Sequence, residues 1–168
     1  MDTRTLAATG WTVPANPAYF ATRLKQMRTR NGVAFTATLR VPTGAIGEIE
    51  NQGDGGATTL YADRVIDREA WKNYVDEWIT MRGYDADRVS YASEELLGIL
   101  VDEADLNRRF TAALKRGQRV VRDPVVDPET WQTDGYPVFI VPDTEETRAI
   151  DLERGHEVWS PEGWTAVS

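Results

Sequence analysis

Apolar and polar side chains alternate along residues 33–41, and this alternation is the clearest pattern in the chain. A repeat of two residues predicts a β-strand. Pro42-Thr43-Gly44 predicts a tight turn into a second strand through residues 46–49, and residues 57–62 predict a third. Because the connections are too short for parallel crossovers, we expect the three strands to form an antiparallel meander.

Apolar positions spaced three and four residues apart predict helices in the middle of the chain. The first predicted helix covers residues 67–83, with Asp67 as its N-cap and Gly83 at its end. The second covers residues 93–116 and carries two apolar stripes that are out of phase. The sequence leaves open whether this helix is continuous or breaks near residues 103–105.

Both ends of the chain carry weaker patterns. Residues 1–16 predict an irregular, flexible arm, and Asn16-Pro17 predicts the start of a helix that ends at Asn31-Gly32. The remaining predicted elements are strands at 119–122 and 136–141 separated by a proline-containing loop, a helix at 144–154, and a hairpin of strands 157–160 and 164–167.

The order of these elements predicts an α+β fold, because strands and helices are grouped rather than alternating. We expect an antiparallel sheet, made from the N-terminal meander and the C-terminal strands, with helices packed on one face. The length of 168 residues fits a single domain over residues 1–168, with 1–16 as the flexible arm.

Charge is distributed unevenly and restricts the classes of partner. The chain has a formal net charge of −8, yet direct counting gives about +5 for residues 1–40. Nucleic acid is therefore disfavoured as a partner, because affinity for phosphates comes mainly from positive surface. The acidic part could face a basic protein or simply keep the chain soluble. The sequence has no segment long and apolar enough for a membrane helix and no signal-peptide pattern, so we expect a cytoplasmic protein.

Residues that carry out catalysis are scarce. The chain has no cysteine, and His156 is its single histidine, which we interpret as structural. We therefore expect no cofactor and no metal site, and a non-enzymatic role is favoured. The enzymatic alternative is a magnesium-dependent carboxylate site, which requires two or more of four residues to meet in a cleft: Asp63, Asp67, Asp102 and Asp105.

A glycine-rich loop between two predicted strands is the most unusual local feature. Asn51-Gln52-Gly53-Asp54-Gly55-Gly56 lacks the Gly-Lys-Ser/Thr of a phosphate-binding loop, and no helix follows it directly. It predicts either a turn with left-handed residues or a recognition loop. If it bound a small anion, Arg40 should converge on it. The candidate binding residues are Asn51, Gly53, Asp54, Gly55, Gly56, Arg40 and Tyr61.

Residues 31–62 also show a resemblance. Gly32-Val33-Ala34-Phe35-Thr36-Ala37-Thr38-Leu39, followed by Gly47 to Gly56 and Tyr61, resembles a segment of small uncharacterised accessory proteins carried by phages and other mobile elements. There, a strand pair precedes an N-x-G-x-G-G loop. The resemblance implies a small accessory protein in a bacterial host cytoplasm, directed against a host system, and it implies no catalytic residues.

Together these observations predict a non-enzymatic accessory protein that binds a host or phage protein and inhibits a host defence system. The alternatives are a protein that binds or sequesters a small molecule or nucleotide through the glycine-rich loop, and the magnesium-dependent enzyme. Self-association is compatible with the sequence. Three tryptophans in predicted loops and turns either anchor an interface or cover a small sheet: Trp131, Trp159 and Trp164.

Overall fold

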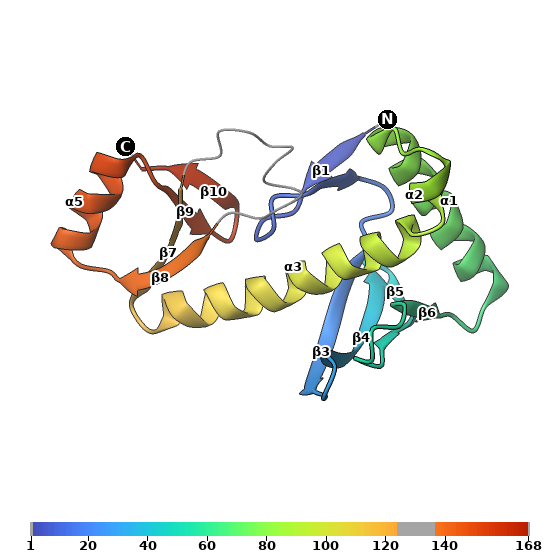
Figure 1. Ribbon diagram of the computed structural model, residues 1–168. Coiled ribbons are helices and arrows are strands. Elements are labelled where there is room, and N and C mark those ends of the chain that lie inside the picture. The colour runs from blue at the N-terminus through green and yellow to red at the C-terminus, as the bar shows by residue number, and fades with distance from the viewer. Residues whose placement is uncertain (1, 124–136, 168) are drawn as a thin grey trace. The chain divides into compact units, whose positions relative to one another are not determined.

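The computed structural model describes residues 2–123 and 137–167, and it has the α+β fold that the sequence predicts. Its strands pair antiparallel in two four-stranded sheets and one two-stranded sheet rather than in one continuous sheet (Figure 1). The chain divides into two compact units. Unit 1 contains residues 1–4 and 12–105, and unit 2 contains residues 5–11 and 106–168. None of the helices within the described ranges combines the length and apolar character needed to cross a membrane.

The sheet of unit 1 is the predicted meander with one additional strand. Its order is β3-β4-β5-β6, with bounds Phe20–Arg28, Val33–Val41, Gly44–Asn51 and Thr59–Tyr61. Ala37, Leu39 and Ile49 are buried on one face of this sheet. Thr36, Thr38 and Glu48, which point to the opposite face, remain partly or fully exposed. The alternation along residues 33–41 therefore reflects a strand with one buried and one exposed face, as expected.

The predicted helix between Asn16-Pro17 and Asn31-Gly32 is wrong, because these residues contain strand β3. A β-bulge interrupts the pairing of β3 with β4 between Thr22 and Lys25. Within the bulge, Arg23 has a φ of 55°. The one extra residue changes the phase of the side chains, so the apolar residues of this strand do not keep a period of two. Phe20, Leu24 and Met27 are instead spaced by four and three residues, as in a helix.

Three helices complete the middle of the chain: α1 (Val65–Arg82), α2 (Ala86–Val89) and α3 (Ala92–Lys115). Gly83 ends α1 in the left-handed conformation, as predicted. Asp67 is not the N-cap, since Arg64 occupies that position. Asp67 instead lies buried in the first turn and binds the Arg64 guanidinium through both carboxylate oxygens, at 2.6 and 2.8 Å. Helix α3 is continuous.

Aromatic side chains form part of the core of unit 1. Tyr19 packs edge-on against Trp71 and Tyr74, with ring centroids 5.2 and 4.7 Å apart. The Tyr74 hydroxyl donates to the Pro14 carbonyl at 2.9 Å. Burial raises the pKa of Tyr74 to about 12, although the nearby Arg4 guanidinium opposes the shift. The Tyr74 phenol is therefore a neutral structural group.

Contrary to the sequence prediction, the N-terminal segment is not irregular throughout. It forms two short strands, β1 (Thr3–Thr5) and β2 (Thr12–Pro14), joined through a turn. In unit 2, the Trp159 indole donates to the Ala7 carbonyl and the Trp164 indole donates to the Ala8 carbonyl, both at 3.0 Å. Each strand has only three residues, too few to show an alternating pattern, so neither could be predicted from the sequence.

Unit 2 contains the second four-stranded sheet, in the order β10-β9-β7-β8. Trp159 and Phe110 pack together in its core, with centroids 5.2 Å apart, so Trp159 covers the sheet from inside. Trp164 packs against the same core. Trp131 and most of the loop predicted before residue 136 lie outside the described residues. The elements are β7 (Gln118–Arg122), β8 (Val138–Pro142), α5 (Glu145–Arg154), β9 (Glu157–Ser160) and β10 (Gly163–Ala166).

His156 is buried in unit 2 and lies between two carboxylates. Its Nδ1 lies 3.0 Å from the Asp151 carboxylate, and its Nε2 lies 3.3 Å from Asp123. Asp151 is itself buried and forms an ion pair with Arg119 at 3.2 Å. This network connects α5 to the strand β7.

Candidate binding surface

The predicted glycine-rich loop connects β5 to β6 and is held in shape by its own side chains. The Asn51 side-chain oxygen accepts from the Gly53 N–H at 2.8 Å. The Asn51 amide nitrogen donates to the Gly56 carbonyl and to the Thr58 hydroxyl, both at 3.1 Å. Asp54 accepts from the Gly56 N–H at 2.9 Å. These bonds satisfy backbone groups locally, so the loop is ordered before it meets any partner.

A side chain at Gly53 would force either the loop or the neighbouring strand to move. It is buried and has a φ of 70°, in the left-handed region that glycine occupies without strain. A Cβ at this position would lie 2.7 Å from the Val33 carbonyl carbon and 2.9 Å from the Ala34 Cα. The glycine therefore allows the loop to approach the backbone of β4 closely.

Two further contacts fix the loop to the body of unit 1. The Thr29 hydroxyl, in the turn between β3 and β4, donates to the Gly53 carbonyl at 2.5 Å. The Thr58 N–H donates to the Glu94 carboxylate at the start of α3, at 3.1 Å. Between these anchors, residues 54–57 are exposed. The loop thus presents a fixed backbone to solvent.

An open groove of about 360 Å³ lies beside the loop. It crosses the end of the sheet where β3, β4 and β5 run side by side. Small side chains at Ala34 and Thr36 lie between the longer side chains of β3 and β5. The groove and residues 51–57 together form what we call the loop–groove surface. The groove is lined by Lys25, Gln26, Met27, Ala34, Phe35, Thr36, Glu50, Asn51 and Gln52.

The structure brings most of the predicted binding residues together but leaves two apart. Asn51, Gly53, Asp54 and the two following glycines belong to the same loop. Arg40 lies near the other end of β4, because Phe35 is the residue that pairs with Asn51. Tyr61 is exposed on β6, where it pairs with Glu48 rather than approaching the loop.

This geometry does not favour the small-anion alternative. The N–H groups of Gly53 and Gly56 already donate to Asn51 and Asp54, so neither is available to an anion. Arg40, the cation that should converge on the loop, lies five residues further along β4 than the position paired with Asn51. At about 3.4 Å per residue this is a separation of roughly 17 Å.

The four carboxylates of the enzymatic alternative do not assemble into a cleft. Asp67 is engaged by Arg64, and Asp63 is exposed before α1. Desolvation, followed by the negative charge of Asp105, raises the pKa of Asp102, but Asp102 lies at the surface rather than in an enclosed site. Within residues 2–123 and 137–167, no group of three or more histidine or acidic side chains is placed to hold a metal ion.

Comparison of the chain with models of protein families, with curated proteins and with solved structures finds no match. The function of this chain is therefore inferred from its own residues. Sequence reasoning identified the loop but missed the contacts of Thr29 and Glu94, which are remote in sequence and carry no motif. The basic residues of β3 were visible in the sequence, but the predicted helix placed them on the wrong element.

Proposed function

We propose that this chain is a non-enzymatic binding protein that acts by protein–protein contact through the loop–groove surface. The observation that supports the proposal most strongly is the combination of internal hydrogen bonds within residues 51–57 and exposure of residues 54–57. A loop that is already ordered loses little conformational entropy when it binds, so more of the contact energy appears as affinity. Residues on ordered, exposed loops are frequent in recognition sites.

The shape and chemistry of the groove suit a protein partner. It is shallow and open, and it combines apolar surface from Met27 and Phe35 with polar groups from Lys25, Glu50 and Asn51. Small-molecule sites are usually enclosed clefts, whereas protein interfaces are flatter and have a polar rim. The partner in this proposal is a host or phage protein. The phage or mobile-element setting, with inhibition of a host defence system, follows from the resemblance of residues 31–62 alone.

The test uses full-length protein as bait in a lysate of the organism that encodes it. A recovered partner is identified by mass spectrometry, purified, and titrated against the bait by isothermal calorimetry. Two variants place a large side chain on the proposed surface, Gln52→Trp at the groove and Ala57→Trp on the loop. Both positions are exposed, and neither has a positive φ.

The matched control is Asn73→Trp, which adds the same side chain at an exposed position on α1. We expect both surface variants to bind the purified partner with an affinity lower by about tenfold or more, equivalent to about 1.4 kcal/mol. The control should bind the partner like wild type. Equal affinity of all three variants would remove the loop–groove surface from the proposal. Circular dichroism of each variant establishes that the fold is retained.

A further inference from the structure

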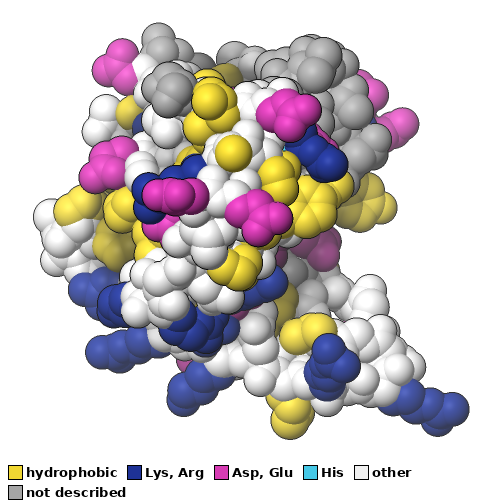
Figure 2. Space-filling view, turned by 90° about the vertical axis from the view of Figure 1, so that its left-hand side faces the viewer, with side chains coloured by type: hydrophobic (Ala, Val, Ile, Leu, Met, Phe, Trp, Pro, Cys, Tyr) yellow, Lys and Arg dark blue, Asp and Glu magenta, His cyan; other side chains and the backbone are white. Residues whose placement is uncertain are grey.

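The second surface that stands out is the β3–β4 hairpin, residues 20–41, which we call the basic hairpin. Residues 23–30, in β3 and the turn that follows it, contain four positively charged side chains, and all four are exposed. The sequence contains no acidic residue from position 3 to position 47. Figure 2 shows lysine and arginine side chains along the lower edge of the view, the direction in which this sheet ends in Figure 1. The four cations are Arg23, Lys25, Arg28 and Arg30.

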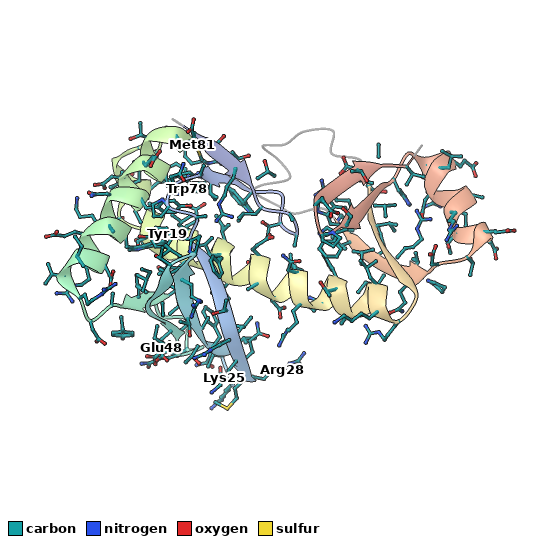
Figure 3. The ribbon with its side chains drawn as sticks, turned by 180° about the vertical axis from the view of Figure 1, so that it is seen from behind. Tyr19, Lys25, Arg28, Glu48, Trp78 and Met81 are labelled. Carbon is teal, nitrogen blue, oxygen red and sulfur yellow. The ribbon has the colours of Figure 1, made fainter. Side chains whose placement is uncertain are left out.

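These cations are not used by the fold. Among the residues that the structure describes, none forms an ion pair or a side-chain hydrogen bond with Arg23, Lys25, Arg28 or Arg30. The nearest acidic residues along the sheet are Glu48 and Glu50 on β5, and β4 lies between them and β3. Figure 3 shows Lys25 and Arg28 at the free end of β3, away from the buried Tyr19 and Trp78. Their positive charge is therefore left for a partner.

Arg23 adds an independent observation. It is the one non-glycine residue with a positive φ among those described, and it lies in the β-bulge of β3. Bulges redirect a side chain relative to a regular strand. Backbone strain of this kind persists where the surrounding structure enforces it and is concentrated at functional sites. A glycine would be unstrained here, yet the chain has an arginine.

Protection of an edge strand explains only part of this arrangement. β3 is at the edge of its sheet, and charged side chains on edge strands prevent pairing with other strands. This accounts for Lys25. It does not account for Arg30, which lies in the turn after β3, where no strand could pair.

An acidic extended peptide is also a poor fit as the occupant. Such a peptide would bind by adding a strand to the free edge of β3. The bulge between Thr22 and Lys25 interrupts that edge. Binding of a nucleic-acid backbone does not require a regular strand edge. Its phosphates are closely spaced, so they can be contacted by cationic side chains that point in different directions. Three of the four cations are arginines, whose planar guanidinium matches phosphate oxygens in pairs.

We propose that the basic hairpin binds the phosphate backbone of a nucleic acid, with Arg23, Lys25, Arg28 and Arg30 as the contacting residues. The net charge of the whole chain disfavoured this class of partner, but that sum includes acidic residues on other elements. The binding is independent of base sequence, because the described groups are cations directed at phosphates. The hairpin shares Lys25 with the groove of the loop–groove surface, whereas Arg23, Arg28 and Arg30 lie outside the groove lining.

The test is a fluorescence anisotropy titration of full-length protein with labelled duplex DNA, single-stranded DNA and single-stranded RNA over a range of salt concentrations. Four phosphate contacts predict a slope of log K against log salt of about −3 to −4 for duplex, and about −3 for single strands. The three arms identify which nucleic acid carries the preferred backbone. Polyglutamate is the fourth probe and represents an acidic protein.

The decisive variant is Arg28→Gln with Arg30→Gln, since both residues are exposed and outside the groove lining. We expect at least a tenfold loss of affinity at low salt, and a slope that is shallower by about 2. The control, Lys115→Gln with Arg154→Gln, changes the net charge equally at exposed positions outside the hairpin. It should change affinity by less than about twofold, because charges outside the contact are screened.

A third variant separates binding from folding. Arg23→Gly removes a cation and relieves the positive φ, so it should weaken binding while keeping or raising the midpoint of unfolding. The proposal is overturned if wild type binds none of the three nucleic acids at low salt, or if both double variants lose affinity equally. Preference for polyglutamate over all three would assign the hairpin to an acidic protein and would also overturn it.

Discussion

Replacement of Gly53 by alanine should destabilise unit 1 more than any other single glycine-to-alanine change in the loop. The added Cβ would lie 2.7 Å from the Val33 carbonyl carbon, 2.9 Å from the Ala34 Cα, and closer still to the Ala34 nitrogen. All three atoms belong to the backbone of the central strand β4, which cannot rotate away as a side chain could. Either the loop or the strand must shift.

The expected magnitude has two parts. A residue with a Cβ in the left-handed region costs about 1–2 kcal/mol, which applies because Gly53 has a φ of 70°. Forcing extra volume into a close contact costs about 1–3 kcal/mol more. The sum is about 2–5 kcal/mol, a large fraction of the 5–15 kcal/mol typical of a whole domain.

Gly55 supplies the matched control within the same loop. Its φ is 89°, so alanine is strained there too, but nothing lies within 4 Å of the added Cβ. Gly55→Ala should therefore cost only the conformational part, about 1–2 kcal/mol. The difference between the two variants isolates the contact with β4.

The assay is chemical denaturation followed by tryptophan fluorescence, to which the buried Trp71 and Trp78 of α1 contribute. Hydrogen exchange of the β4 amides provides a second measurement restricted to the affected strand. If Gly55→Ala costs as much as Gly53→Ala, the close approach between loop and strand is not what makes Gly53 necessary, and the reasoning fails.

Three further predictions concern other parts of the molecule. Asn51→Asp keeps the acceptor for the Gly53 N–H but removes both donated bonds, so it should cost about 1–3 kcal/mol and speed amide exchange in the loop. The pKa of Tyr74 is about 12 in the folded protein, against an ordinary value of 10. Because the unfolded chain loses this proton first, the contribution of Tyr74 to the free energy of unfolding is intact below pH 10 and is lost as the pH rises to 12. Denaturation at increasing pH should therefore show a loss of up to about 3 kcal/mol that Tyr74→Phe abolishes. Trp159→Phe leaves the Ala7 carbonyl without its donor and should cost about 1–3 kcal/mol, with faster proteolysis of residues 5–11, whereas unchanged cleavage would contradict the anchoring role.

The sequence predicted strands best where the pattern was regular. Residues 33–41 form β4 as expected, because the alternation has no interruption and one face of the strand is buried. The same reasoning failed at residues 20–28. There the bulge at Arg23 changes the phase of the side chains, and a bulge has no reliable signature in a single sequence.

The candidate site was predictable only in its local part. The loop at residues 51–56 was identified from its glycines, and its connection of β5 to β6 is confirmed. Its use in binding stays a prediction. The association of Arg40 with the loop was not supported, because distance along a strand depends on register, and register is set by pairing with β5 rather than by local composition. The contact of Thr58 with Glu94 spans 36 residues and had no sequence signal.

The two apolar stripes of α3 show what a change of phase in a helical pattern means physically. The sequence allowed either a break near residues 103–105 or one helix that meets two surfaces. No glycine or proline occurs from residue 99 to residue 116, so nothing there interrupts the backbone hydrogen bonds, and the helix continues to Lys115. Along α3, unit 1 ends at Asp105 and unit 2 begins at Leu106, which is also where the two apolar stripes change phase. Leu96 and Leu100 are buried within unit 1, and Phe110 and Ala113 belong to the core of unit 2. An out-of-phase stripe in a helix without breakers therefore indicates a change of packing partner, not the end of the helix.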